Sequence, residues 1–197
     1  PLESTNGEIR TVAITRTFSP GFYTYHLVIG GNFNTVTVSG VNHTRNGIAK
    51  LIATQTLVLP ITHSNYSLSA WNADLDMTPL LTGVSAEGVD DLLITGDTIL
   101  FSGRFWAVNN SSTYDLRDGL AAYSLTGTLL AYPAIASSGT YNSSRFYALQ
   151  KEGGNLYLGG YVNGVGLGNG RLFKLDASGT PIGSFSYPSS AVRAVYG

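Results

Sequence analysis

The chain has 197 residues, a formal net charge of −1 and 43% hydrophobic residues, which predict one folded domain with a sizeable core. Its few Lys and Arg residues are scattered singly, and this pattern argues against a nucleic-acid partner. There is no cysteine, which excludes disulfides and thiolate metal sites.

Short runs rich in Val, Ile, Leu, Tyr and Thr, divided by Gly, Asn, Asp and Ser, predict strands along the whole chain. Residues 1–197 divide into three units of four strands, which cover approximately residues 9–60, 89–132 and 145–185. The first unit has strands at residues 9–15, 25–33, 47–53 and 56–60. The second has strands at residues 89–95, 98–106, 119–125 and 128–132. The third has strands at residues 145–150, 155–162, 171–176 and 181–185.

Two recurring lines define these units. The first line reads Leu-Val-Ile-Gly-Gly-Asn-Phe at residues 27–33, and it returns at residues 99–105 and 156–162. The second reads Arg-Asn-Gly-Ile-Ala-Lys-Leu at residues 45–51, and it returns at residues 117–123 and 168–175. A repeated unit of four antiparallel strands predicts an all-β fold, either a β-propeller or a segment of one. We expect the Gly-Gly pairs to allow a bulge or a close approach of neighbouring sheets.

Two stretches depart from the repeat. Residues 61–87 contain irregular extra strands, which form either an elaborated outer edge or a degenerate blade. Residues 190–197 are typical of the first strand of a further blade. Because propellers usually have four or more blades, either the chain is a segment of a longer protein or this last strand pairs with a blade elsewhere.

These lines resemble the delta-60 type β-propeller repeat of exported bacterial repeat and adhesin-like proteins. A related repeat occurs in the fungal cortical-marker ectodomain. The resemblance extends roughly over residues 9–197 and is clearest over residues 89–185. It implies blades of four antiparallel strands in a scaffold or adhesive array, without catalytic residues.

The loop at residues 106–115 is the predicted ligand-binding site. It carries Trp and Tyr beside Asn and Ser, a combination with which proteins commonly bind sugars, and loops on a rigid scaffold often carry binding residues. The alternative is that these aromatic rings pack neighbouring sheets. The predicted ligand-binding residues are Trp106, Asn109, Asn110, Tyr114 and Asp115. Sequons for glycosylation in predicted loops begin at Asn42, Asn65, Asn109, Asn110 and Asn142.

Patterns for catalysis or metal binding are weak. Asp90 and Asp91 are adjacent, but neighbours on a strand point to opposite faces unless a bulge intervenes. The three histidines, His26, His43 and His63, lack metal-ligand spacing. Residues 72–76 resemble the start of a calcium loop but lack its glycine and distal glutamate. We therefore expect no catalytic residues, no metal and no cofactor, with calcium on an Asp-bearing loop as the alternative.

The charged fraction, only 12%, is about half that of a typical soluble domain and favours an extracellular or cell-surface protein. No apolar run approaches the roughly 18 residues of a membrane span, so membrane insertion is not expected. The predicted function is a non-enzymatic binding or scaffold module of a surface adhesin, fibre or filament. Its partners would be a glycan or protein, further repeats of the same chain, or other copies. The alternatives are a carbohydrate-active enzyme on the same scaffold and a structural subunit that self-assembles through edge strands.

Overall fold

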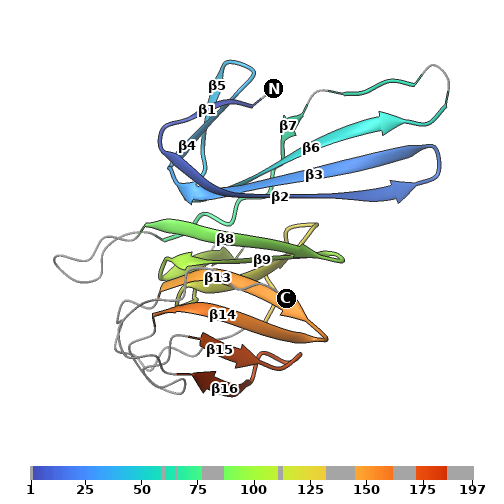
Figure 1. Ribbon diagram of the computed structural model, residues 1–197. Helices are drawn as coiled ribbons and strands as arrows, with labels where there is room; N and C mark the ends of the chain where they lie inside the picture. The colour runs from blue at the N-terminus through green and yellow to red at the C-terminus, as the bar shows by residue number, and fades with distance from the viewer. Residues whose placement is uncertain are drawn as a thin grey trace.

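The computed structural model describes residues 2–58, 61–64, 66–76, 87–110, 113–131, 145–161 and 172–185. Within these ranges the regular elements are strands and their pairings are antiparallel, which confirms the predicted all-β fold. The strands form several sheets, and three of these lie one above the other (Figure 1). No helix that could cross a membrane is found in the described ranges.

The three stacked sheets correspond to the three predicted units. Sheet 1, at the top of Figure 1, contains β2 (Glu8–Ser19), β3 (Phe22–Asn32), β6 (Ile48–Thr56) and β7 (Ser67–Leu68) in that order. Sheet 2 has the order β12-β9-β8, with bounds β8 (Gly88–Thr95), β9 (Thr98–Arg104) and β12 (Leu120–Ser124). Sheet 3 contains β13 (Arg145–Glu152), β14 (Asn155–Tyr161), β15 (Leu172–Leu175) and β16 (Pro181–Phe185) in sequence order.

The fourth strand of sheet 1 differs from the prediction. Of the strand predicted at residues 56–60, residues 59–60 lie outside the described residues. β6 ends at Thr56, whose N donates to Thr62 O at 2.9 Å. The outer strand is β7, in which Ser67 and Leu68 pair with β6. The outer strand of sheet 1 therefore comes from residues after 61 and not from residues 56–60. The described part of residues 61–87 thus includes an elaborated outer edge of sheet 1.

Sheets 2 and 3 follow the prediction more closely. In sheet 2, the position of the fourth strand is held by a single bridge between Tyr123 and Leu129, and Leu130 N donates to Ala122 O at 2.9 Å. In sheet 3, β13 to β16 lie where four strands were predicted. The predicted strand at residues 190–197 lies outside the described residues.

Two smaller sheets were not predicted. The first, which we call the arm, has the order β1-β4-β5, with bounds β1 (Leu2–Thr5), β4 (Thr35–Val38) and β5 (Val41–Thr44). Ser39 and Gly40 both have positive φ between β4 and β5, as a tight two-residue hairpin turn requires. The second is a hairpin of β10 (Ala107–Asn110) and β11 (Thr113–Leu116).

A β-bulge recurs at the start of the first strand of each stacked sheet, opposite the Gly-containing line. The register shifts between Ile9 and Thr11, between Val89 and Asp91, and between Phe146 and Ala148. A Cβ on the opposing Gly31, Gly103 or Gly160 would lie less than 3.0 Å from a backbone oxygen of the bulged strand. On Gly30 it would overlap Val89 of sheet 2. The prediction that these glycines permit a bulge and a close approach of sheets is confirmed.

The core lies between the stacked sheets. One apolar cluster joins sheets 1 and 2 and includes Val28, Ile48, Ile99 and Phe101. A second joins sheets 2 and 3 and includes Leu100, Phe146, Leu158 and Phe173. A third fixes the arm to the other side of sheet 1, where Val36 and Val38 pack with Ile29 and Leu51. The middle sheet is thus covered on both faces, whereas sheet 1 is covered on one face and only partly on the other.

Candidate functional site

The predicted binding loop at residues 106–115 is a hairpin that packs against the core. Trp106 is buried, and its backbone N donates to Asp76 O at 3.1 Å. Asn109 is half-buried; its N donates to Ala73 O at 2.7 Å, and its carbonyl accepts from the Tyr123 hydroxyl. Because its ring lies inside the fold, Trp106 is not available to stack on a ligand. It packs in the core, which is the alternative given above for the aromatic residues.

The exposed side of this hairpin carries Tyr114. Its hydroxyl donates to Asp74 Oδ2 at 3.0 Å, and desolvation and the Asp74 carboxylate raise the pKa of Tyr114. Asp115 pairs with Arg117 at 3.8 Å. Asn110 pairs with Thr113 through the backbone, and its side chain lies outside the described residues. The predicted ligand-binding residues therefore divide into Trp106, which is buried, and an exposed polar surface around Tyr114.

The calcium-loop candidate at residues 72–76 supports this surface. Asp74 has a φ of 39°, and its Oδ1 accepts from Asn46 Nδ2 at 2.6 Å while Oδ2 accepts from Tyr114. Both carboxylate oxygens thus have protein partners. In the described part of the chain, no three His, Asp or Glu side chains gather as a metal site requires.

Among the sequons, Asn42 is exposed on β5, where its Oδ1 accepts from Thr37 Oγ1 at 2.8 Å. Asn109 is half-buried within β10. Asn65, Asn142 and the side chain of Asn110 lie outside the described residues. Asn42 is therefore an accessible sequon, on the arm and away from the stacked core.

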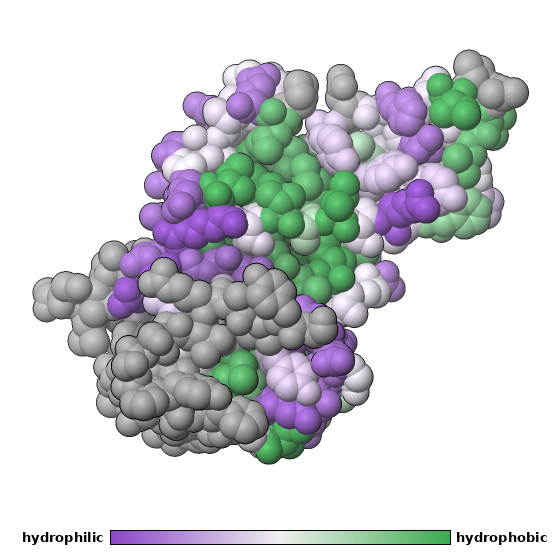
Figure 2. All heavy atoms as spheres, viewed as in Figure 1, coloured by the Kyte–Doolittle hydropathy of each residue, from purple (hydrophilic) through white to green (hydrophobic). Residues whose placement is uncertain are grey.

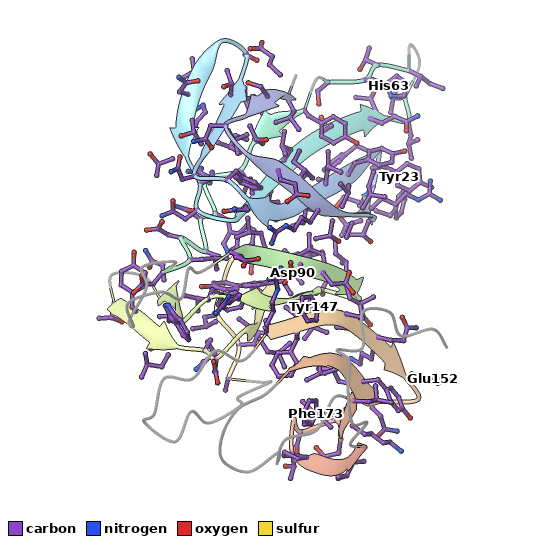
Figure 3. The ribbon with its side chains drawn as sticks, turned by 60° about the vertical axis from the view of Figure 1, so that its left-hand side comes forward. Tyr23, His63, Asp90, Tyr147, Glu152 and Phe173 are labelled. Carbon is purple, nitrogen blue, oxygen red and sulfur yellow. The ribbon has the colours of Figure 1, made fainter. Side chains whose placement is uncertain are left out.

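Asp90 and Asp91 occupy the bulge of β8, where all three sheets meet (Figure 3). Asp90 accepts from Arg10 Nη1 at 2.9 Å, and from Arg145 Nε at 2.6 Å and Nη2 at 2.8 Å. Glu87 adds ion pairs to Arg10, Arg145 and Arg104. The carboxylate of Asp90 therefore connects β2 of sheet 1 to β13 of sheet 3.

Asp91 makes a second connection between the same strands. It accepts from Leu149 N at 2.9 Å in sheet 3 and from Thr11 Oγ1 at 3.5 Å in sheet 1. Burial raises the pKa of Asp91, while these hydrogen bonds oppose the shift. The bulge that a paired-carboxylate site needs is present, but the geometry assigns these two groups to holding the sheets together. The sequence signal for this role is that Arg10 and Arg145 lie beside the equivalent bulges of sheets 1 and 3, where they can pair with Asp90.

A pocket of about 340 Å³ opens between sheets 1 and 2. Its lining residues are Thr17, His26, Asp97, Ser124, Leu125 and Thr126. His26 is only 8% exposed, and its Nε2 lies 3.2 Å from Thr17 Oγ1. Its buried Nδ1 has no hydrogen-bond partner among the described residues. Sequence spacing does not predict this pocket, because its lining residues come from two different sheets.

Lys50 is buried beside the pocket. Its Nζ donates to the carbonyl of Leu125, and burial lowers the pKa of the ammonium group. Burial, and to a lesser degree Lys50, also lower the pKa of His26. Because an unperturbed histidine has a pKa of about 6.5, His26 is neutral at pH 7.

The outer side of sheet 1 exposes a row of apolar side chains on β2, which we call the β2 face: Ile9, Val12, Ile14 and Phe18. Figure 2 shows apolar residues gathered across the middle of the molecule, over sheet 1. Val12 is 58% exposed, whereas Leu92 and Leu149, which follow the bulge at the same position in sheets 2 and 3, are 8% and 5% exposed. The difference arises because a neighbouring sheet covers Leu92 and Leu149.

Compared with protein-family models, curated proteins and solved structures, the chain matches none of them.

Proposed function

We propose that the chain is a β-propeller-type repeat segment, with one sheet per blade, that acts as a non-enzymatic scaffold and binding module at a cell surface. The resemblance to delta-60 repeats and the low charged fraction, 12%, support this reading. The recurring bulge opposite a glycine supports the equivalence of the three sheets, since the first two strands of each sheet pair through the same local geometry.

The β2 face carries the proposal. Ile9 occupies the position of Val89 in sheet 2 and Phe146 in sheet 3, because the three residues pair with the equivalent glycines Gly31, Gly103 and Gly160. Val89 and Phe146 are fully buried under the preceding sheet, whereas Ile9 is exposed. The same residue position thus faces a sheet of this repeat twice and faces solvent once.

The occupant of the β2 face is a further four-stranded sheet of the same repeat. The arm covers the inner strands of sheet 1, where Ile29 and Leu51 are buried, and leaves the row on β2 open. The docking sheet therefore meets β2 beside the arm. Stacking of faces, as opposed to edge-strand pairing, is then the mode of assembly, because buried apolar area is its main driving force.

The scaffold presents its hairpins to other partners. Tyr114 on the β10–β11 hairpin and Asn42 on the arm are both exposed. Each is held by a side-chain hydrogen bond, to Asp74 and Thr37 respectively. A protein or glycan partner would bind such fixed polar groups rather than Trp106, which is buried.

Sedimentation of the purified chain over a range of concentrations tests the scaffold proposal, because another copy can supply the missing sheet. We expect concentration-dependent association in the wild type and its loss in Ile14→Lys, which places a charge in the β2 face. Thr113→Lys, on the exposed side of β11, is the matched control and should associate as the wild type does. A wild type that stays monomeric throughout, or equal association of Ile14→Lys, would contradict the proposal.

A further inference from the structure

We propose that the pocket between sheets 1 and 2 binds a small, neutral, polyhydroxylated ligand about the size of a monosaccharide. The pocket is formed by Thr17 and His26 of sheet 1 and by the turns of sheet 2 that carry Asp97 and Thr126. It is separate from both the β2 face and the Tyr114 hairpin, and the inference does not rest on the proposed scaffold function.

The polar groups of the pocket match the hydroxyls of such a ligand. Thr17, Ser124 and Thr126 each present a hydroxyl that can donate and accept, and Ser124 Oγ lies 2.7 Å from Thr126 Oγ1. The Asp97 carboxylate accepts only, so it suits two adjacent hydroxyl donors. Leu125 adds an apolar surface suited to the C–H groups of a sugar ring.

His26 lines the sheet 1 side of the pocket and carries one buried ring nitrogen without a partner in the described part of the chain. It is more than nine-tenths buried, and Nδ1 has no hydrogen bond within the described structure although Nε2 lies beside Thr17. Buried polar atoms of folded proteins are nearly always hydrogen-bonded to protein, water or ligand. The Thr17 hydroxyl beside His26 Nε2 lines the same side of the pocket, and a ligand hydroxyl can bond to it because both hydroxyls donate and accept.

The charges around the pocket favour a neutral ligand. The buried ammonium of Lys50, which donates to Leu125 O, disfavours a cation at the inner end. The Asp97 carboxylate disfavours an anion at the rim. A volume of about 340 Å³ is at the small end of ligand pockets and holds one sugar ring rather than a chain of them.

The backbone holds this arrangement in place. Leu125 N donates to Asp97 O at 2.7 Å, so the two turns that form the rim are bonded to each other. Thr128 N donates to Ser124 Oγ at 3.0 Å, which fixes the position of that hydroxyl. The pocket is therefore formed before a ligand enters, which lowers the entropic cost of binding.

The test uses glucose, galactose, mannose, N-acetylglucosamine and inositol as probes at millimolar concentrations. Saturation-transfer NMR detects binding, and amide shift changes locate it. The variants Asp97→Ala and Thr126→Ala remove exposed rim groups, so the fold should persist, and circular dichroism checks this. Glu152→Ala removes an exposed carboxylate beside the corresponding turn of sheet 3 and is the matched control.

We expect at least one probe to shift the amides of Thr17, His26 and Ser124. Asp97→Ala should weaken that binding by about tenfold or more, the loss typical of a hydrogen bond to a charged group, and Thr126→Ala by about threefold or more, as for a neutral group. Glu152→Ala should bind as the wild type does. Binding by none of the probes, shifts confined to other residues, or unchanged affinity in both rim variants would overturn the proposal.

Discussion

Asp90 lies where the three stacked sheets meet, and its replacement by alanine should destabilise the fold by about 3 kcal/mol. Its side chain is 7% exposed and accepts three charge-assisted hydrogen bonds, one from Arg10 and two from Arg145. Removing one partner of a buried ion pair typically costs about 3–5 kcal/mol. The lower end applies because Glu87 still pairs with both arginines.

Urea unfolding monitored by fluorescence measures this effect, since the two tryptophans of the chain, Trp71 and Trp106, are both buried. For a domain of this size about 1 kcal/mol lowers Tm by about 2–4 °C, so Asp90→Ala should melt about 6–12 °C below wild type. Glu8→Ala is the control; its side chain is 66% exposed, and its pair with Arg10 should contribute less than about 1 kcal/mol. If Asp90→Ala costs no more than Glu8→Ala, the three sheets are not joined through this carboxylate.

Three further changes test separate parts of the fold. Gly103→Ala should destabilise by about 3 kcal/mol in urea unfolding, because its Cβ would overlap β8, while Gly183→Ala has open space and should stay within about 1 kcal/mol of wild type; equal effects would refute the bulge argument. The pKa of His26 is lowered in the folded state, so the unfolded state binds its proton first as pH falls; wild-type stability should be greatest above about pH 6.5 and decline below it. His26→Gln should lack that decline in urea titrations across pH 5–8, and an identical pH profile would contradict the assignment. Trp106→Ala should cost about 3–5 kcal/mol as a core deletion, whereas Tyr114→Ala should cost less than about 1 kcal/mol; the reverse order would restore Trp106 as a surface residue.

The stacked sheets were largely predictable because their signals are local. Short runs of apolar residues and Gly-containing turns mark β8, β9, β13 and β14 in the sequence itself. The arm had a local signal as well: two alternating runs flank Ser39-Gly40, a dipeptide suited to a tight hairpin. The repeat nevertheless predicts a loop there, because its second strand is expected to lead directly to its third.

The interactions between sheets were not predictable from local patterns. Arg10, Asp90 and Arg145 come together only once each sheet has bulged and the three have stacked. The pocket likewise joins His26 on β3 to Asp97 in a turn of sheet 2. The sequence predicts Trp106 at the surface because it ends a predicted strand and begins a loop, yet β10 lies along residues 73–76 and the ring is buried. The spacing of residues along the sequence does not predict any of these contacts between sheets.

Thiol labelling of Val12→Cys tests most directly whether the β2 face is a docking position, and the absence of native cysteine makes the label unique. Leu149→Cys, at the equivalent buried position of sheet 3, and Thr113→Cys, on the exposed side of the hairpin, are the two references. The β2-face account predicts that Val12→Cys reacts as fast as Thr113→Cys in dilute solution and becomes protected, like Leu149→Cys, as concentration rises. A Val12→Cys labelling rate that stays the same at every concentration would contradict it.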